Sequence, residues 1–122
     1  MSTEYYIITK DKAKAMGTFN MDEFELTDTP YWGYRVRVMT ISAGWKPMLY
    51  AYHEIESASD YVDLLGTENW EMYDEYRQKI SAEDFIDILK DRLKQPKTLK
   101  TEFTFLDKEG FTMFDYHKYM GA

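Results

Sequence analysis

The sequence lacks cysteine altogether and has only two histidines among its 122 residues. Without cysteine the chain has no disulfide framework, no thiolate nucleophile and no cysteine-ligated metal. The two histidines, His53 and His117, are too few for a metal cluster without carboxylates beside them at helical spacing. We therefore expect no metal and no other cofactor, and the reducing cytoplasm is the compartment that fits.

Long apolar runs and catalytic motifs are also missing. No segment approaches the roughly 18–20 consecutive apolar residues that cross a bilayer, and the first five residues show neither part of a secretory signal. The sequence has no phosphate-cradling glycine loop, no dinucleotide fingerprint and no nucleophile elbow. We expect no contact with a membrane, we assign no catalytic residue, and we predict that the protein is not an enzyme.

Apolar residues make up 44% of the chain and aromatic residues 17%, which is ample for one hydrophobic core. Only six glycines and three prolines are present and they form no linker, so we treat residues 1–122 as a single domain. Apolar–polar alternation and turn residues predict strands at 4–9, 34–41, 48–55, 69–76, 98–106 and 111–114.

Capping serines mark the start of the main predicted helices. Ser57 and Ser81 each stand three residues before an aspartate, the spacing of a capping box, and they begin predicted helices over 57–65 and 81–94. Shorter helical turns are expected at two further places, 11–16 and 20–26. These elements predict an α+β fold in which an antiparallel sheet, built from hairpins or a meander, packs against about two main helices. We expect helices on one side of this sheet and an aromatic area on part of the other.

The charge of the chain is unevenly distributed. Residues 51–91 contain twelve acidic and three basic residues, a net charge of −9, whereas the other 81 residues contain ten and twelve, a net charge of +2. Carboxylates without partners repel one another, so a dense group of them lowers stability unless it serves another purpose. Because affinity for nucleic acid comes from lysine and arginine, this acidity argues against direct nucleic-acid binding and favours a basic protein partner.

The clearest candidate site lies on the predicted helix over 81–94. On a helical wheel four carboxylates fall opposite the apolar residues: Glu83, Asp84, Asp87 and Asp91. The last three are roughly 4–6 Å apart along the helix axis, comparable with the roughly 6–7 Å between phosphates of one nucleic-acid strand. Such a stripe can present to a basic groove some of the regularly spaced negative charges that a phosphate backbone presents. The alternative is an ordinary solvated face, which most amphipathic helices have.

Aromatic residues near these acids supply candidate anchors. The run from Tyr73 to Tyr76 mixes rigid aromatic area with charge, the composition favoured at protein interfaces, and Trp45 stands in a predicted hairpin loop. We predict no catalytic or metal site. The predicted partner-binding residues are Glu83, Asp84, Asp87, Asp91, Asp60, Asp63, Tyr73, Asp74, Glu75, Tyr76 and Trp45.

Four short segments resemble small accessory proteins of phages and prophages of Gram-positive bacteria. They are Ala-Gly-Trp-Lys-Pro at 43–47, Asp-Glu-Tyr at 74–76, Ser-Ala-Glu-Asp-Phe at 81–85 and Asp-Lys-Glu-Gly-Phe at 107–111. The resemblance implies a bacterial cytoplasmic setting and an inhibitor of host defence, of the anti-CRISPR or anti-restriction type. Such an inhibitor would use an acidic aromatic face to occlude a basic nucleic-acid-binding groove.

Two other functions remain open at this point. An immunity or antitoxin protein that neutralises a basic toxin such as a nuclease would use the same electrostatics, and the neighbouring genes would distinguish it. A small-ligand binder would use the aromatic face of the sheet with His53, Arg35 and Arg37, and would need a deep pocket with convergent polar groups.

Overall fold

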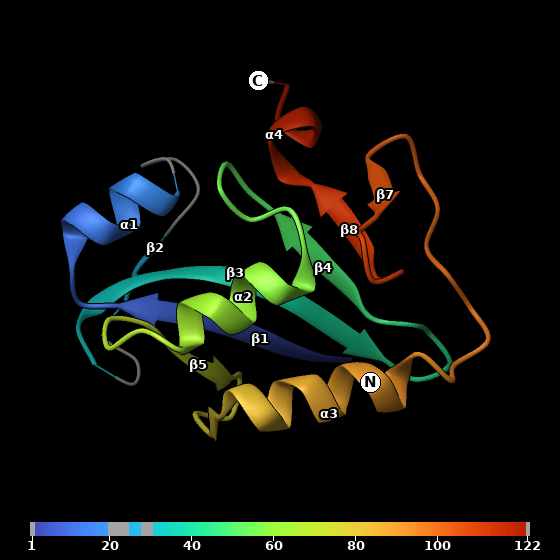
Figure 1. The fold of residues 1–122 in the computed structure, drawn as a ribbon, viewed down its shortest axis with the longest axis horizontal. Coiled ribbons are helices and arrows are strands. Elements are labelled where there is room, and N and C mark those ends of the chain that lie inside the picture. The colour runs from blue at the N-terminus through green and yellow to red at the C-terminus, as the bar shows by residue number, and fades with distance from the viewer. Residues whose placement is uncertain (1, 20–24, 28–30, 122) are drawn as a thin grey trace.

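The computed structural model describes residues 2–19, 25–27 and 31–121. These residues form eight strands and four helices in an α+β arrangement (Figure 1), which confirms the predicted fold class. The strands are β1 Ser2–Thr9, β2 Glu25–Thr27, β3 Gly33–Ser42, β4 Met48–Ala51, β5 Glu71–Asp74, β6 Lys79–Ile80, β7 Thr104–Leu106 and β8 Thr112–Asp115. The helices are α1 Lys12–Thr18, α2 Ala58–Leu65, α3 Ala82–Arg92 and α4 Tyr116–Tyr119. Within these ranges no helix combines the length and the apolar character that crossing a membrane requires.

All strands belong to one sheet, in the order β6-β5-β1-β3-β4-β8-β7, and β2 pairs with the first residues of β3. Every pairing is antiparallel except that of β4 with β8, which is parallel. The sheet is therefore mixed, and the antiparallel prediction holds only in the main. The parallel pair is possible because a long connection, which includes α2 and α3, separates β4 from β8, whereas a tight turn can join only antiparallel neighbours.

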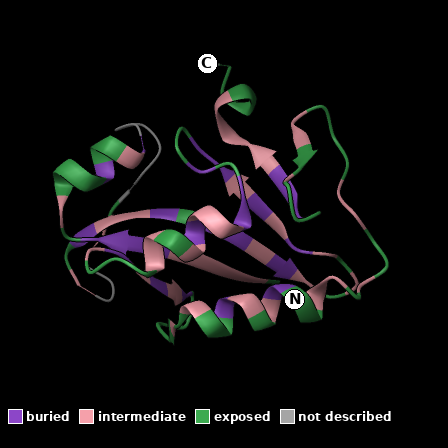
Figure 2. Ribbon diagram, in the orientation of Figure 1, coloured by how far each residue is buried: buried purple, intermediate pink, exposed green. Residues whose placement is uncertain are grey.

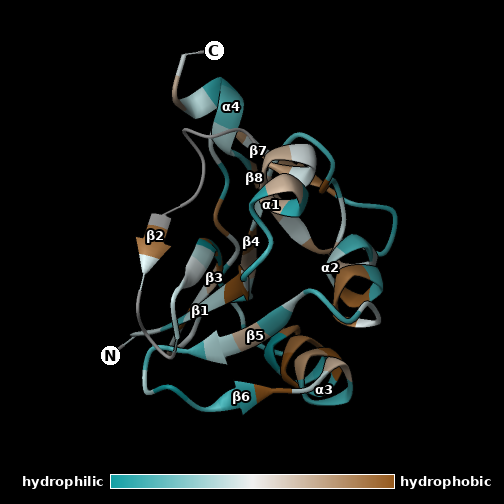
Figure 3. Cartoon of the chain, turned by 90° about the vertical axis from the view of Figure 1, so that its left-hand side faces the viewer, coloured by the Kyte–Doolittle hydropathy of each residue, from teal (hydrophilic) through white to brown (hydrophobic). Residues whose placement is uncertain are grey.

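Helices α1, α2 and α3 lie on one face of the sheet (Figures 1 and 3), which we call the helix side. The core lies between them and the sheet, where Ile7 and Val36 of the central strands pack with Tyr61 of α2 and Phe85 of α3. We call the opposite face the open face; in the described part of the chain only the short helix α4 reaches it, at the end of β4 and β8, where the rings of Tyr116 and Tyr119 contact Tyr50 and Phe114. One-sided helical cover therefore agrees with the expectation from sequence.

The capping serines begin α2 and α3 where expected. The hydroxyl of Ser57 accepts a hydrogen bond from Asp60 N at 3.2 Å, and that of Ser81 accepts one from Asp84 N at 3.0 Å. Each satisfies a backbone donor that has no partner inside its helix. In the same way Asp11 caps α1 by accepting from Lys14 N at 3.2 Å.

Several predicted strands are shorter in the structure. Only Thr104–Leu106 of the predicted strand 98–106 forms a strand, and directly before it Thr101 N donates to the hydroxyl of Thr104 at 2.9 Å in a local turn. Side-chain hydroxyls that bond nearby backbone groups compete in this way with strand pairing.

The predicted strand 48–55 ends at Ala51, since Tyr52 and Ile55 bond each other's backbone in a turn, and the predicted strand 69–76 is reduced to Glu71–Asp74. The predicted helical turn at 20–26 falls mostly on residues 20–24, outside the described ranges. Its last two residues belong to β2.

Candidate functional site

Helix α3 presents the four carboxylates of the prediction to solvent. Phe85 is 0% exposed and Leu89 is also buried, so one side of the helix faces the core and the other faces outward (Figure 2). Glu83, Asp84, Asp87 and Asp91 are all exposed. Among the described residues none of these four carboxylates takes part in an ion pair. We call this set the α3 stripe.

Two lysines reduce the charge at one end of the α3 stripe. Lys90 and Lys94 are exposed, and each follows an aspartate of the stripe by three residues, a spacing that places side chains side by side on a helix. The negative charge is therefore densest in the first two turns, around Glu83 and Asp87. Acidic residues near a helix N-terminus are also favoured by the helix dipole.

The two predicted carboxylates of α2 differ in exposure. Helix α2 packs against α3, and the rings of Tyr61 and Phe85 meet edge to face at this contact. Asp63 is exposed. Asp60 is half-buried, and its carboxylate accepts a hydrogen bond from Glu56 N at 2.8 Å, so it serves the start of the helix. Of these two carboxylates, only that of Asp63 is exposed.

The predicted run from Tyr73 to Tyr76 does not join the α3 stripe. The turn between β5 and β6 lies at the opposite end of β6 from α3 (Figure 3). Asp74 is only 9% exposed, and its carboxylate accepts hydrogen bonds from Tyr76 N at 2.8 Å and Gln78 N at 2.9 Å. It closes the turn and contributes no exposed charge.

The other three members of this run also lie away from α3. Tyr76 is 61% exposed at the turn, and Glu75 accepts a hydrogen bond from Glu4 N at 3.1 Å. Tyr73 pairs with Tyr6 across β5 and β1. These residues belong to the open face and its edge, so the structure separates the predicted aromatic anchors from the predicted acidic surface.

Trp45 lies beside the segment that follows α3, because the backbone of its loop is hydrogen-bonded to that of Lys97. Its side chain is 37% exposed, and the ammonium of Lys97 lies 5.4 Å from the centre of its ring. The backbones of the two residues form an isolated parallel bridge. Trp45 is therefore partly displayed, but beside a cation.

A second surface, which sequence reasoning described only as an aromatic area, crosses five strands on the open face. Tyr73 lies opposite Tyr6, Tyr6 lies opposite Arg37, and Tyr50 lies opposite Phe114. Arg37 donates a hydrogen bond to the hydroxyl of Tyr50 at 3.5 Å and so connects the two halves. We call these five residues the sheet row. Alternation along each strand identifies its members one by one, but only the strand order shows that they are neighbours.

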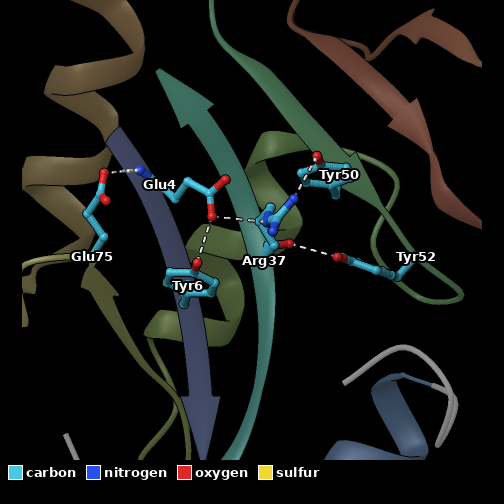
Figure 4. Close-up of polar contacts among 6 residues, drawn as sticks. All are labelled: Glu4, Tyr6, Arg37, Tyr50, Tyr52 and Glu75. Carbon is cyan, nitrogen blue, oxygen red and sulfur yellow. Dashed lines mark hydrogen bonds and ion pairs between the residues drawn. The ribbon is translucent and has the colours of Figure 1, made fainter. Parts of the chain in front are cut away.

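Polar contacts hold the centre of the sheet row (Figure 4). One carboxylate oxygen of Glu4 accepts a hydrogen bond from the Tyr6 hydroxyl at 2.6 Å and lies 3.3 Å from Nε of Arg37. The Tyr52 hydroxyl donates to the Arg37 carbonyl at 2.7 Å. Burial, with the hydrogen bond to Glu4, raises the pKa of Tyr6, and the hydrogen bond to Tyr50 raises the pKa of Arg37. At neutral pH Tyr6 is therefore neutral and Arg37 is charged.

Glu71 forms a similar contact at the other end of the open face. Its carboxylate accepts a hydrogen bond from Tyr31 at 2.8 Å and lies 2.7 Å from the ammonium of Lys79. The hydrogen bond with Lys79 lowers the pKa of Glu71, whereas burial, with the hydrogen bond to Glu71, raises the pKa of Tyr31.

The open face is shallow where a small-ligand site was considered. The hollow that Arg35 lines has a volume of about 110 Å³, below the roughly 300–1,000 Å³ of ligand pockets. His53 does not line this hollow, and its ring lies 6.5 Å from that of His117. In the described ranges no group of three or more histidine or acidic side chains is arranged to hold a metal ion. The small volume counts against a small-ligand site at Arg35, whereas a larger hollow of about 430 Å³ lies beside Tyr31 and Glu71.

No protein-family model, curated protein or solved structure matches the chain. Functional inference therefore rests on the contacts, exposure and charge described above.

Proposed function

We propose that this protein is a non-enzymatic binding module that inhibits by occlusion. In this proposal the α3 stripe, together with Asp63 of α2, docks into the basic nucleic-acid-binding groove of a partner protein. The supporting observation is that the carboxylates of the stripe are exposed and free of ion pairs with other described residues.

Helical spacing adds a second physical argument. Glu83 and Asp87 are four residues apart, as are Asp87 and Asp91, and like charges at this spacing destabilise a helix by a few tenths of a kcal/mol per pair, about 0.2–0.5 kcal/mol. A cationic groove removes this repulsion on binding. Electrostatic steering also speeds the association of the stripe with such a groove, and this effect weakens as the salt concentration rises.

The length of the α3 stripe limits how much of a nucleic-acid strand it can imitate. From Asp84 to Asp91 the helix rises about 10 Å, so the stripe spans two or so phosphate steps of a single strand. Together with the net charge of −7 and the nearby lysines, this favours local competition for a groove over imitation of a whole duplex. Within this proposal, the partner is a nucleic-acid-processing protein of a bacterial host, and a phage-encoded inhibitor of host defence is the setting that the resembling segments suggest.

Capture and competition test the proposal. The purified protein is immobilised, bacterial lysate is passed over it at low and at high salt, and bound proteins are eluted with nucleic acid. We expect a basic protein that binds at low salt, is released by nucleic acid, and is not retained by a variant carrying D84K, D87K and D91K.

A matched control makes the outcome specific. The exposed residues Glu54, Glu102 and Glu109 lie outside the stripe, and E54K, E102K and E109K change the net charge by the same amount. Retention of the partner by the stripe variant, or equal loss of the partner by both variants, would contradict docking through α3.

A further inference from the structure

A hollow lies directly beside the first turn of α3. Its volume is about 370 Å³, within the roughly 300–1,000 Å³ of ligand pockets. Its walls come from the end of α2 at Leu65, the loop that follows, the strands β5 and β6, and the first residue of α3, Ala82. Ala82 directly precedes Glu83, so the hollow adjoins the α3 stripe along the chain. We call it the α3 hollow.

Apolar side chains form much of the wall of the α3 hollow. Met72 of β5 lies opposite Ile80 of β6, and Met72 belongs to the core, so both side chains lie on the helix side of the sheet. An edge-to-face contact with Phe19, with ring centres 5.5 Å apart, holds Trp70 in place. Trp70 and Met72 are buried, whereas Leu65 and Ile80 are half-buried. The hollow therefore offers a preformed apolar surface to an incoming side chain.

The charges around the α3 hollow leave one carboxylate without a counter-ion. Glu71 and Lys79 pair at 2.7 Å and together add no net charge. Glu68 is exposed and forms no ion pair within the described ranges. Helix α2 ends at this hollow with no basic residue in its last turn, and the C-terminal end of a helix carries partial negative charge. The positive end of α3 is offset by Glu83 and Asp84 in its first turn. The hollow therefore favours a cationic group.

We propose that the α3 hollow receives an arginine side chain of the partner whose basic groove binds the α3 stripe. The inference rests on the proposed function and names the kind of residue that anchors the partner. The methylenes of the arginine pack on Trp70 and Ile80, as long cationic side chains do on apolar surfaces. The guanidinium forms a bidentate contact with Glu68. Lysine fits less well, because its ammonium is a compact and strongly hydrated charge.

Two other occupants fit the observations less well. An apolar anchor would cover Glu68 without giving this carboxylate a partner, and burying an unpaired charge is costly. A small polar ligand would be better placed in the hollow beside Tyr31, which shares Glu68 and Glu71 but is otherwise lined by polar residues such as Asn69 and by no residue of α3. Arginine in a well-packed pocket is also a frequent hot spot of protein interfaces.

Fluorescence anisotropy tests this inference at low salt with the full chain and labelled hexa-arginine and hexa-lysine peptides. The two peptides carry the same charge, so their general attraction to the stripe is equal and a difference in affinity reports the guanidinium. We expect hexa-arginine to bind about tenfold more tightly, the effect of one hydrogen bond between charged groups. E68Q should remove most of this preference by weakening the binding of hexa-arginine.

Three further variants make the result specific. E54Q removes a carboxylate that is exposed outside the hollow and should leave the preference for arginine unchanged. T67W places a bulky ring at the exposed Thr67 on the wall of the hollow. It should lower the affinity for hexa-arginine to that for hexa-lysine, with an unchanged circular dichroism spectrum. A variant with D84N, D87N and D91N should weaken both peptides alike and keep their ratio.

Three results would overturn the inference. One is equal affinity of the wild type for the two peptides, and another is an unchanged preference for arginine in both E68Q and T67W. The third is equal affinity for N-acetyl-arginine amide and hexa-arginine, which would identify a small-ligand site separate from the stripe. Because the peptide assay does not need the host partner, the two proposals fail separately. Loss of the arginine preference leaves capture through α3 intact, and failure of capture leaves the arginine preference measurable.

Discussion

The rings of Tyr61 and Phe85 meet edge to face with their centres 6.2 Å apart, and this contact joins α2 to α3. Both side chains are fully buried. Their packing fixes which side of α3 faces the core, and therefore which side carries the stripe to solvent. The orientation of the acidic surface is thus determined by apolar contacts on the reverse of the helix.

Removing this contact should destabilise the fold strongly. We expect F85A to lower the free energy of unfolding by about 3–5 kcal/mol, because truncating a buried phenylalanine leaves a cavity. D87A, on the exposed side of the same helix, should change it by no more than about 0.5 kcal/mol. Urea denaturation followed by circular dichroism measures both, and similar losses in the two variants would contradict the orientation of α3.

Asp74 should prove to be a structural residue. Its carboxylate accepts two backbone hydrogen bonds in the β5–β6 turn, so we expect D74A to lower the free energy of unfolding by about 1–3 kcal/mol. D74N keeps one acceptor oxygen, so it should lose less of the free energy of unfolding than D74A. If D74A were as stable as the wild type, the carboxylate would not be closing the turn.

Removing the N-cap of α3 should have an intermediate effect on stability. The Ser81 hydroxyl satisfies Asp84 N, and S81A should therefore lower the free energy of unfolding by about 1 kcal/mol, whereas S81D, which keeps a capping oxygen, should be close to neutral. Thermal denaturation of the three proteins compares them. Equal losses in S81A and S81D would mean that the hydroxyl contributes in another way.

Stability should depend on pH through Glu71. Lys79 lowers the pKa of this carboxyl in the folded state, so the charged form stabilises the fold above the unfolded pKa of about 4.3. That contribution is lost as the pH falls through the folded pKa. We expect E71Q to melt below the wild type at pH 7 and to approach it in strong acid. E109Q, at an exposed position in the turn before β8, is the control and should show no such convergence.

Local signals in the sequence predicted local structure well. Ser57 and Ser81 mark the starts of α2 and α3 because a cap depends on residues three apart. The outward position of Asp87 follows from the period of the helix. The strand predicted over 98–106 was wrong around Thr101 and Thr104, because the hydroxyl of Thr104 bonds backbone groups of Thr101 within the same segment.

Relationships between distant segments could not be predicted in this way. Tyr50 and Phe114 are neighbours only because β4 and β8 pair in parallel, and no short-range pattern encodes that pairing. The separation of Tyr76 from Glu83 also depends on where β6 ends and α3 begins. The sequence predicted the acidic and aromatic residues as one partner-binding group, whereas the fold places the α3 stripe and the run from Tyr73 to Tyr76 on different parts of the surface.

Hydrogen–deuterium exchange of the protein with and without its captured partner tests the central claim most directly. Docking through the α3 stripe should slow exchange of the amides of residues 83–91 and leave the strands of the open face unchanged. Slower exchange in β1, β3 and β5, with α3 unchanged, would show that the partner binds the other side of the sheet and would contradict the account.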